Sequence, residues 1–138
     1  MLDFDVNWWA VLVSTIAAFA IGSLWYSPIM FSKIWQREAK LSDADIASGN
    51  MVMLFGTTFV LAAIQATLFA AAVAGLFPAD PALGDVIIFS LVIGVGWIAI
   101  SFATGYLYER RSMTLWLINA GYNIALFLAF GLIIGLWQ

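Results

Sequence analysis

The chain has 138 residues, of which 64% are hydrophobic and only 9% are charged, and its net charge is −3. A soluble domain carries about a quarter charged residues, so this composition excludes a water-soluble globular protein and favours a membrane protein. The chain has neither Cys nor His, which excludes disulfides, thiolate nucleophiles and thiolate metal sites and removes the commonest general base.

The N-terminal segment predicts a membrane helix that is retained. A secretory signal begins with a basic region, whereas this segment is acidic, with Asp3 and Asp5. The string Ala18-Phe19-Ala20 resembles a cleavage site, but the apolar run continues past it to Leu24 and is long enough to span a bilayer. We therefore expect the first membrane helix at residues 7–27.

Charged residues divide the chain into four long uncharged runs. A helix needs about 20 apolar residues to cross a hydrocarbon core of about 30 Å, so each run suffices for one crossing and none suffices for two. The predicted spans are residues 7–27, 52–77, 86–108 and 114–137. The predicted fold class is an all-α integral membrane protein, in which residues 1–138 form a single transmembrane domain of four helices.

The five basic residues predict the orientation of these helices. They lie in two loops, one between the first and second spans and one between the third and fourth, at Lys33, Arg37, Lys40, Arg110 and Arg111. Short cytoplasmic loops carry an excess of Lys and Arg, so both basic loops are predicted to be cytoplasmic and both termini to lie outside. The expected location is a bacterial inner (plasma) membrane.

The segment after the first span, residues 28–40, predicts a short amphipathic helix in the membrane interface. Ser27 is expected to cap it and Pro28 to occupy its first position. Its aromatic face would lie toward lipid and its cations toward anionic headgroups. The residues expected to contact headgroups are Lys33, Trp35, Arg37, Lys40, Arg110 and Arg111. The alternative is a cationic lip that attracts an anionic solute.

No Asp, Glu, Lys or Arg lies within any predicted span. Proton-coupled transporters usually need an ionisable group inside the membrane, and voltage sensors need several, so the sequence argues against both. Sodium coupling stays open, because neutral oxygen atoms can coordinate that ion.

Neutral polar and aromatic residues gather in the predicted cytoplasmic half of the spans. These residues are Trp25, Tyr26, Ser27, Tyr106, Asn119, Tyr122 and Asn123. Lipid offers an amide no partner, so each Asn must find one within protein. One interpretation is a packing cluster of hydrogen bonds between helices. The other is a small polar pocket that opens to the cytoplasm.

Small residues spaced four apart predict close approach between helices, as at Gly131 and Gly135. Four helices form a thin bundle with uncovered apolar flanks, so we expect a homo-oligomer or a larger membrane complex. A weak internal repeat aligns residues 19–25 with residues 102–108. It fits either a duplicated helical hairpin or the shared composition of apolar helices.

Several strings in the chain resemble one known group of proteins. They are Asn7-Trp8-Trp9-Ala10-Val11, Gly22-Ser23-Leu24-Trp25-Tyr26-Ser27-Pro28 with the following Phe31, and Ile118-Asn119-Ala120-Gly121-Tyr122. The chain resembles the domain of unknown function 1761 family, small bacterial membrane proteins with four predicted spans. The resemblance implies the same fold class and transfers no catalytic or ligand-binding residue.

Three classes of function remain for this sequence. We favour a non-catalytic membrane protein that acts through assembly, as a homo-oligomer or an accessory subunit. The alternative is a passive or sodium-linked channel or transporter for a small neutral or anionic solute. An enzyme acting on lipid would have Ser27 or Ser101 as its nucleophile without His or an intramembrane Lys as its base. We expect no cofactor, no metal and no nucleic-acid partner; membrane lipids are the expected contacts.

Overall fold

The computed structural model describes residues 5–137, so Asp3 lies outside the described part of the chain. Four helical segments are long and apolar enough to cross a membrane. They are α1 (Trp8–Trp25), α4 (Met51–Leu76), the continuous segment Leu83–Glu109 and α7 (Met113–Leu136). Residues 5–137 contain no β-strand. The predicted all-α membrane fold with four spans is therefore confirmed.

Polar caps fix where three of these helices begin. The Asn7 side chain accepts hydrogen bonds from the backbone N–H groups of Trp9 and Ala10 at the start of α1. Asn50 caps α4 and Ser112 caps α7 in the same manner. Such side chains satisfy N–H groups that have no partner within the helix, which is why these three apolar runs become helical just after a polar residue.

The third span contains a π-helical stretch. It consists of α5 (Leu83–Leu91), η1 (Val92–Ala99) and α6 (Ile100–Glu109). Gly94 in η1 faces the backbone of α7, where an added Cβ would lie 3.2 Å from the Cα of Ile124. Trp97, on the same stretch, points outward and is 66% exposed. The π-helical turns change the rotation of the span, so its two halves present different faces to α7.

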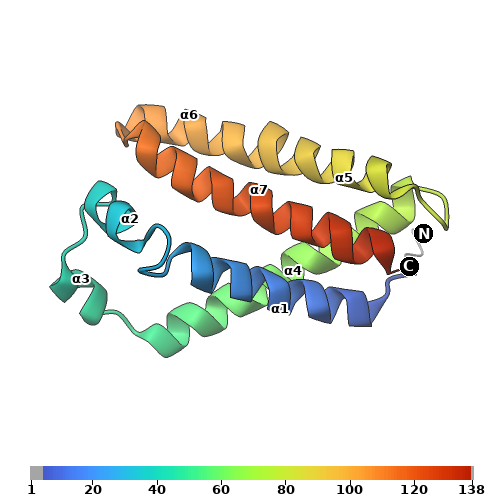
Figure 1. Ribbon diagram of the computed structural model, residues 1–138, viewed down its shortest axis with the longest axis horizontal. Coiled ribbons are helices and arrows are strands. Elements are labelled where there is room, and N and C mark those ends of the chain that lie inside the picture. Colours follow the sequence, from blue (N-terminus) through green and yellow to red (C-terminus); the bar gives the residue numbers. More distant parts are fainter. Residues whose placement is uncertain (1–4, 138) are drawn as a thin grey trace.

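Helix α7 lies at the centre of the bundle, against the third span on one side and α1 on the other (Figure 1). Helix α4 packs on α1 and reaches α7 mainly through the side chain of Phe69. The start of α1 and the end of α7 lie at the same end of the bundle, where the Asn7 side-chain amide donates to the Trp137 carbonyl at 3.2 Å. We call this the terminal end.

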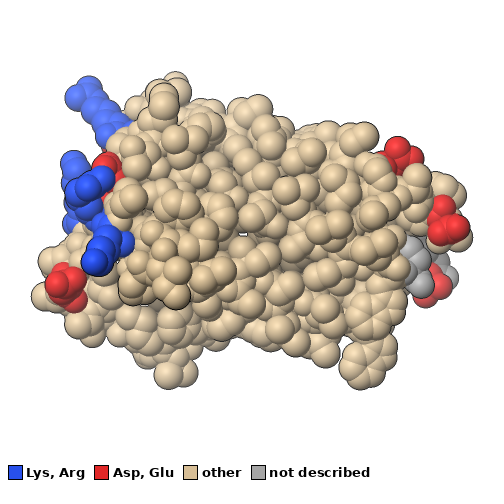
Figure 2. All heavy atoms as spheres, in the orientation of Figure 1, with Lys and Arg blue, Asp and Glu red and all other residues tan. Residues whose placement is uncertain are grey.

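The opposite end, which we call the basic end, carries the basic residues (Figure 2). It also holds two short helices, α2 (Ser32–Glu38) and α3 (Asp43–Ala47). Helix α2 begins four residues after Pro28, and its N-cap position is Phe31. Ser27 was expected to cap a helix here, but its hydroxyl instead donates to the Leu24 carbonyl at 2.6 Å. The cause is a turn over residues 26–31, which delays the helix.

The core combines small and aliphatic side chains with three phenylalanine rings. Phe69 of α4 lies with its ring centroid 5.9 Å from Phe127 and 6.1 Å from Phe130, both on α7. Close packing beside them requires a glycine, because a Cβ at Gly131 would collide with the Ser90 hydroxyl. By contrast, every residue of α4 from 51 to 61 is exposed. The two halves of α4 therefore have different surroundings.

Candidate functional site

The end of α1 is anchored to α7 through Trp25. Its indole Nε1–H donates to the backbone carbonyl of Ile118 at 2.9 Å. The ring fits because residue 121 is glycine: a Cβ there would lie 3.0 Å from the Trp25 ring. Gly22 makes similar room one turn earlier, where a Cβ would lie 3.1 Å from the Tyr122 hydroxyl oxygen. Small residues thus let the aromatic side chains of one helix reach the next.

Asn119 joins three parts of the chain through its side-chain amide. The Tyr26 hydroxyl donates to Asn119 Oδ1 at 2.7 Å, and Asn119 Nδ2 donates to the Tyr106 hydroxyl at 2.7 Å. Tyr26 follows α1 and Tyr106 belongs to α6, so one amide on α7 connects both neighbours of that helix. Asn123 Nδ2 donates to the Asn119 backbone carbonyl at 2.9 Å.

Aromatic contacts surround these hydrogen bonds. The Tyr26 ring lies 5.5 Å from Tyr122 and 5.8 Å from Trp35 of α2, both in edge-to-face geometry. The Trp25 ring lies 5.0 Å from Phe31. Edge-to-face pairs bring a positive ring edge to a negative ring face and add to the packing energy. They hold α2 against the ends of α1 and α7.

Of the seven residues proposed from the sequence as a pocket or packing cluster, six come together. We call them the Asn119 cluster: Trp25, Tyr26, Tyr106, Asn119, Tyr122 and Asn123. Ser27 lies beside them, but its hydroxyl is used within its own turn. Sequence reasoning missed Gly22 and Gly121 as the positions that admit the rings. It also missed Trp116, whose indole donates to the Ala99 carbonyl at 2.8 Å, at the end of η1.

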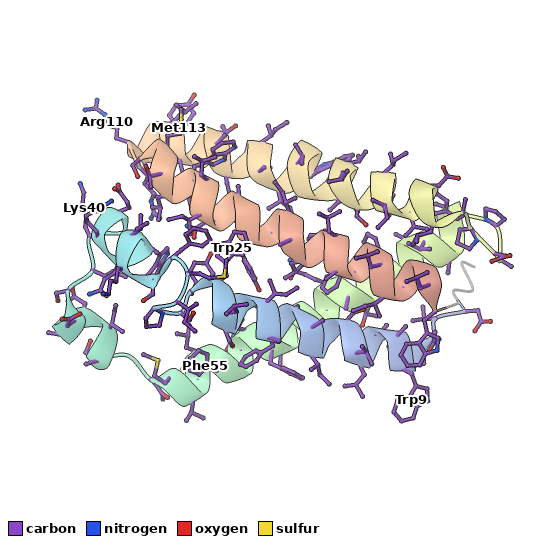
Figure 3. The ribbon with its side chains drawn as sticks, in the orientation of Figure 1. Trp9, Trp25, Lys40, Phe55, Arg110 and Met113 are labelled. Atoms are coloured by element: carbon purple, nitrogen blue, oxygen red, sulfur yellow. The ribbon has the colours of Figure 1, made fainter. Side chains whose placement is uncertain are left out.

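A cavity of about 330 Å³ lies beside the Asn119 cluster, between α1, α2, α4 and α7. Its walls are mainly apolar or aromatic, with the hydroxyl-bearing residues Ser23, Tyr26, Thr58 and Tyr122 among them. Figure 3 labels Phe55 of α4, one of the residues that line this cavity. The Thr58 hydroxyl donates to the Leu54 carbonyl, and that of Tyr26 is taken by Asn119. Two of the four hydroxyls are thus used within the chain, and the mainly apolar walls suit an occupant that is mostly apolar.

Charged side chains lie outside the Asn119 cluster, in the loops at the basic end. The Ser112 hydroxyl and the Arg37 guanidinium hold the pKa of the Glu38 carboxyl below its usual value. Hydrogen bonds from the Ser42 backbone and side chain likewise lower the pKa of Asp45. Between residues 5 and 137, His, Cys, Asp and Glu nowhere form a group of three that could hold a metal ion.

Comparison with known proteins places the chain in a family. Residues 9–135 match the family described as protein of unknown function (DUF1761). This match covers every residue of the Asn119 cluster and the four membrane-spanning helices except the first residue of α1 and the last residue of α7. No curated protein and no solved structure matches the chain.

Proposed function

The chain belongs to the DUF1761 family, and we propose that it is a non-catalytic membrane protein that acts by assembling with further copies of itself. The observation that carries this proposal is the exposed first half of α4. Residues 51–61 lie within a membrane-spanning helix and not one of them is buried. This half contacts α1 through Phe55 and Phe59, whose rings lie 6.0 and 5.9 Å from that of Phe19, and the rest of its surface is open to a second copy.

Exposure of apolar side chains alone does not favour a protein partner, because lipid is as apolar as leucine. The polar and small residues on these surfaces carry more weight. On the first half of α4, Thr57 is exposed, and its hydroxyl has no hydrogen-bond partner within residues 5–137. A hydroxyl in the hydrocarbon core gains free energy when a neighbouring helix supplies a partner. Gly56, next to Thr57, has open space around its Cα and would let a helix approach closely.

The Asn119 cluster supports assembly over transport. The amide oxygen of Asn119 and the hydroxyl proton of Tyr26 are used in bonds to each other, and Tyr106 accepts from the same amide. Polar groups that hydrogen-bond to one another join the helices, and fewer of their donors and acceptors remain to bind a solute. The neighbouring cavity has mainly apolar walls, which suit a neutral polar or anionic solute poorly.

We place the protein in the bacterial inner membrane with both basic loops in the cytoplasm. The support is the gathering of all five basic residues at one end (Figure 2), since short cytoplasmic loops are enriched in Lys and Arg. Because the natural chain has no Cys, single-cysteine variants report orientation directly. In intact spheroplasts, Ser48→Cys should stay unlabelled by a membrane-impermeant maleimide, and Ala79→Cys should be labelled. The reverse pattern would contradict the orientation.

Assembly is tested by the mass of the protein in nanodiscs or mild detergent. Wild type should form an oligomer, and Gly56→Leu should raise the dissociation constant about tenfold, since a bulky side chain keeps helices apart. Gly96→Leu is the matched control, because Gly96 also faces open space but lies on the third span. A wild-type protein that stays monomeric at every protein-to-lipid ratio would refute the proposal.

A further inference from the structure

Two hollows at the basic end meet at the same two residues. The first, of about 420 Å³, is polar, and its lining includes Lys40, Arg110, Arg111 and Ser112. The second, of about 290 Å³, lies between α6 and α7 and is lined mainly by apolar side chains, but it also includes Arg111 and Ser112. We call them the polar cavity and the apolar groove. A polar site that adjoins an apolar one matches the two parts of an amphiphile.

The charges of the polar cavity favour an anion. Arg111 Nε pairs with Glu109 at 2.7 Å, and the second carboxylate of the cavity, Glu38, pairs with Arg37 at 3.3 Å. Cations outnumber carboxylates in the lining of the cavity, and each carboxylate has an ion-pair partner. Lys40 and Arg110 form no ion pair within residues 5–137, although Lys40 also stabilises the charged form of Glu38 electrostatically. Both side chains project from the basic end (Figure 3).

The backbone holds Lys40 and Arg110 in an unusual conformation. Lys40 and Arg110 are the non-glycine residues with positive φ in the described chain, at 59° and 56°. Each ends a helix in the same way: the N–H of the residue that follows it bonds to the carbonyl five residues before, as Leu41 to Gln36 and Arg111 to Tyr106. Glycine is the usual residue at this position, because a side chain there is strained. Two strained cations, about 70 residues apart in sequence, line one cavity.

The apolar groove runs from Arg111 and Ser112, where it meets the polar cavity, along the membrane-spanning part of the bundle. Ala103 and Leu107 of α6 form one wall, and Met113 and Trp116 of α7 form the other. The Arg111 guanidinium lies 5.4 Å from the centre of the Tyr106 ring, at the junction of groove and cavity. Since α6 ends at Glu109 and α7 begins at Met113, the polar cavity lies at the depth of lipid headgroups.

We propose that the polar cavity and the apolar groove together bind one anionic phospholipid, with its phosphate among Lys40, Arg110 and Arg111 and an acyl chain along Ala103 and Trp116. The apolar groove is the reason to choose a lipid over free phosphate, since a soluble anion would leave it unused. The site does not involve α4 and is independent of the proposed assembly.

Native mass spectrometry of the detergent-purified protein tests this site with phosphatidylglycerol and phosphatidylcholine as probes. Phosphatidylglycerol should bind more tightly. Lys40→Gln should weaken its binding about fivefold, the contribution of one basic residue near an anionic lipid. Lys33→Gln removes the same charge from α2 outside the cavity and should change binding less than twofold. Equal effects of the two variants, or equal binding of the two lipids, would overturn the proposal.

Two further variants keep the test free of folding artefacts and identify the ligand. Lys40→Gly combined with Arg110→Gly relieves two strained positions, so the melting temperature should not fall while phosphatidylglycerol binding falls about tenfold or more. A fall in melting temperature together with unchanged lipid binding would count against the site. Ala103→Phe fills the apolar groove and should weaken the binding of phosphatidylglycerol. If inorganic phosphate binds as tightly as phosphatidylglycerol and Ala103→Phe changes neither, the ligand is not a lipid.

Discussion

The two halves of the bundle are held together by different interactions. In the terminal half, Phe69, Phe127 and Phe130 interlock, and Gly131 lets the third span approach α7 closely. In the basic half, the first turns of α4 are exposed, and the other helices are joined by the hydrogen bonds of Asn119 and the ring contacts of Tyr26.

The difference shows how each half answers the same physical problem. Helices in lipid gain little from the hydrophobic effect when they associate, so contact must come from close packing or from hydrogen bonds. The terminal half has glycine and interlocking rings and uses close packing. The basic half, where α4 contributes no buried residue before Ala62, uses polar side chains to join α1, α6 and α7.

The largest expected effect is a difference in stability between substitutions of a phenylalanine in the terminal half and one in the basic half. Phe130→Ala should lower the free energy of unfolding by about 3 kcal/mol, because the ring is fully buried and leaves a cavity. Phe55→Ala, on the exposed part of α4, should cost less than about 1 kcal/mol, because the ring is 51% exposed and lipid can fill its place. Unfolding in mixed detergent micelles, followed by tryptophan fluorescence, measures both. Similar costs would show that α4 is packed along its whole length.

A smaller effect is expected from the polar connection in the basic half. Asn119→Leu should lower the free energy of unfolding by about 1–2 kcal/mol, because it removes the hydrogen bonds to Tyr26 and Tyr106. Asn123→Leu is the matched control: its side-chain bond lies within α7, so it should cost about 0.5 kcal/mol or less.

A double-mutant cycle between positions 119 and 26 sharpens this result. Tyr26→Phe should add little to the cost of Asn119→Leu, since both changes remove the same hydrogen bond. Strictly additive costs from the same micelle unfolding experiment would mean that the bond does not stabilise the fold.

The smallest effect is local and depends on pH. The pKa of Asp45 is lowered because its carboxylate accepts a hydrogen bond from the Ser42 backbone and Ser42 caps α3 in return. A lowered folded-state pKa means that the stabilisation is present above the ordinary value of 3.8 and is lost as the pH falls through the folded-state value. Amide exchange in α3 should therefore speed up in acid relative to its intrinsic rate, while that in the terminal half should not.

The variant Asp45→Asn provides the control for this pH dependence. It removes the titrating group, so exchange in α3 should be fast at neutral pH and nearly insensitive to acid. Equal loosening of both halves in acid would mean that the basic end and the aromatic core unfold as one unit.

Much of the fold could be predicted because hydropathy and charge act locally. The spans expected at residues 7–27 and 114–137 correspond to α1 and α7, which begin and end within two residues of those limits. The candidate cluster was also accessible, because an amide such as Asn119 must find a partner in a membrane. The partners of this amide could not be predicted from the sequence. The choice of Tyr26 and Tyr106 depends on the rotation of three helices.

The sequence by itself determined the number of spans, the separation of a basic end from a terminal end and the residue types that can join helices. Tertiary structure alone decided that α4 leaves its first half exposed, that the third span contains η1, and that Lys40 and Arg110 meet at one cavity. The physical reason is that these spans are apolar on every side. No polar stripe marks which face of these helices packs inward. The rotation of each helix and its choice of neighbours therefore depend on how the side chains fit together in the folded chain.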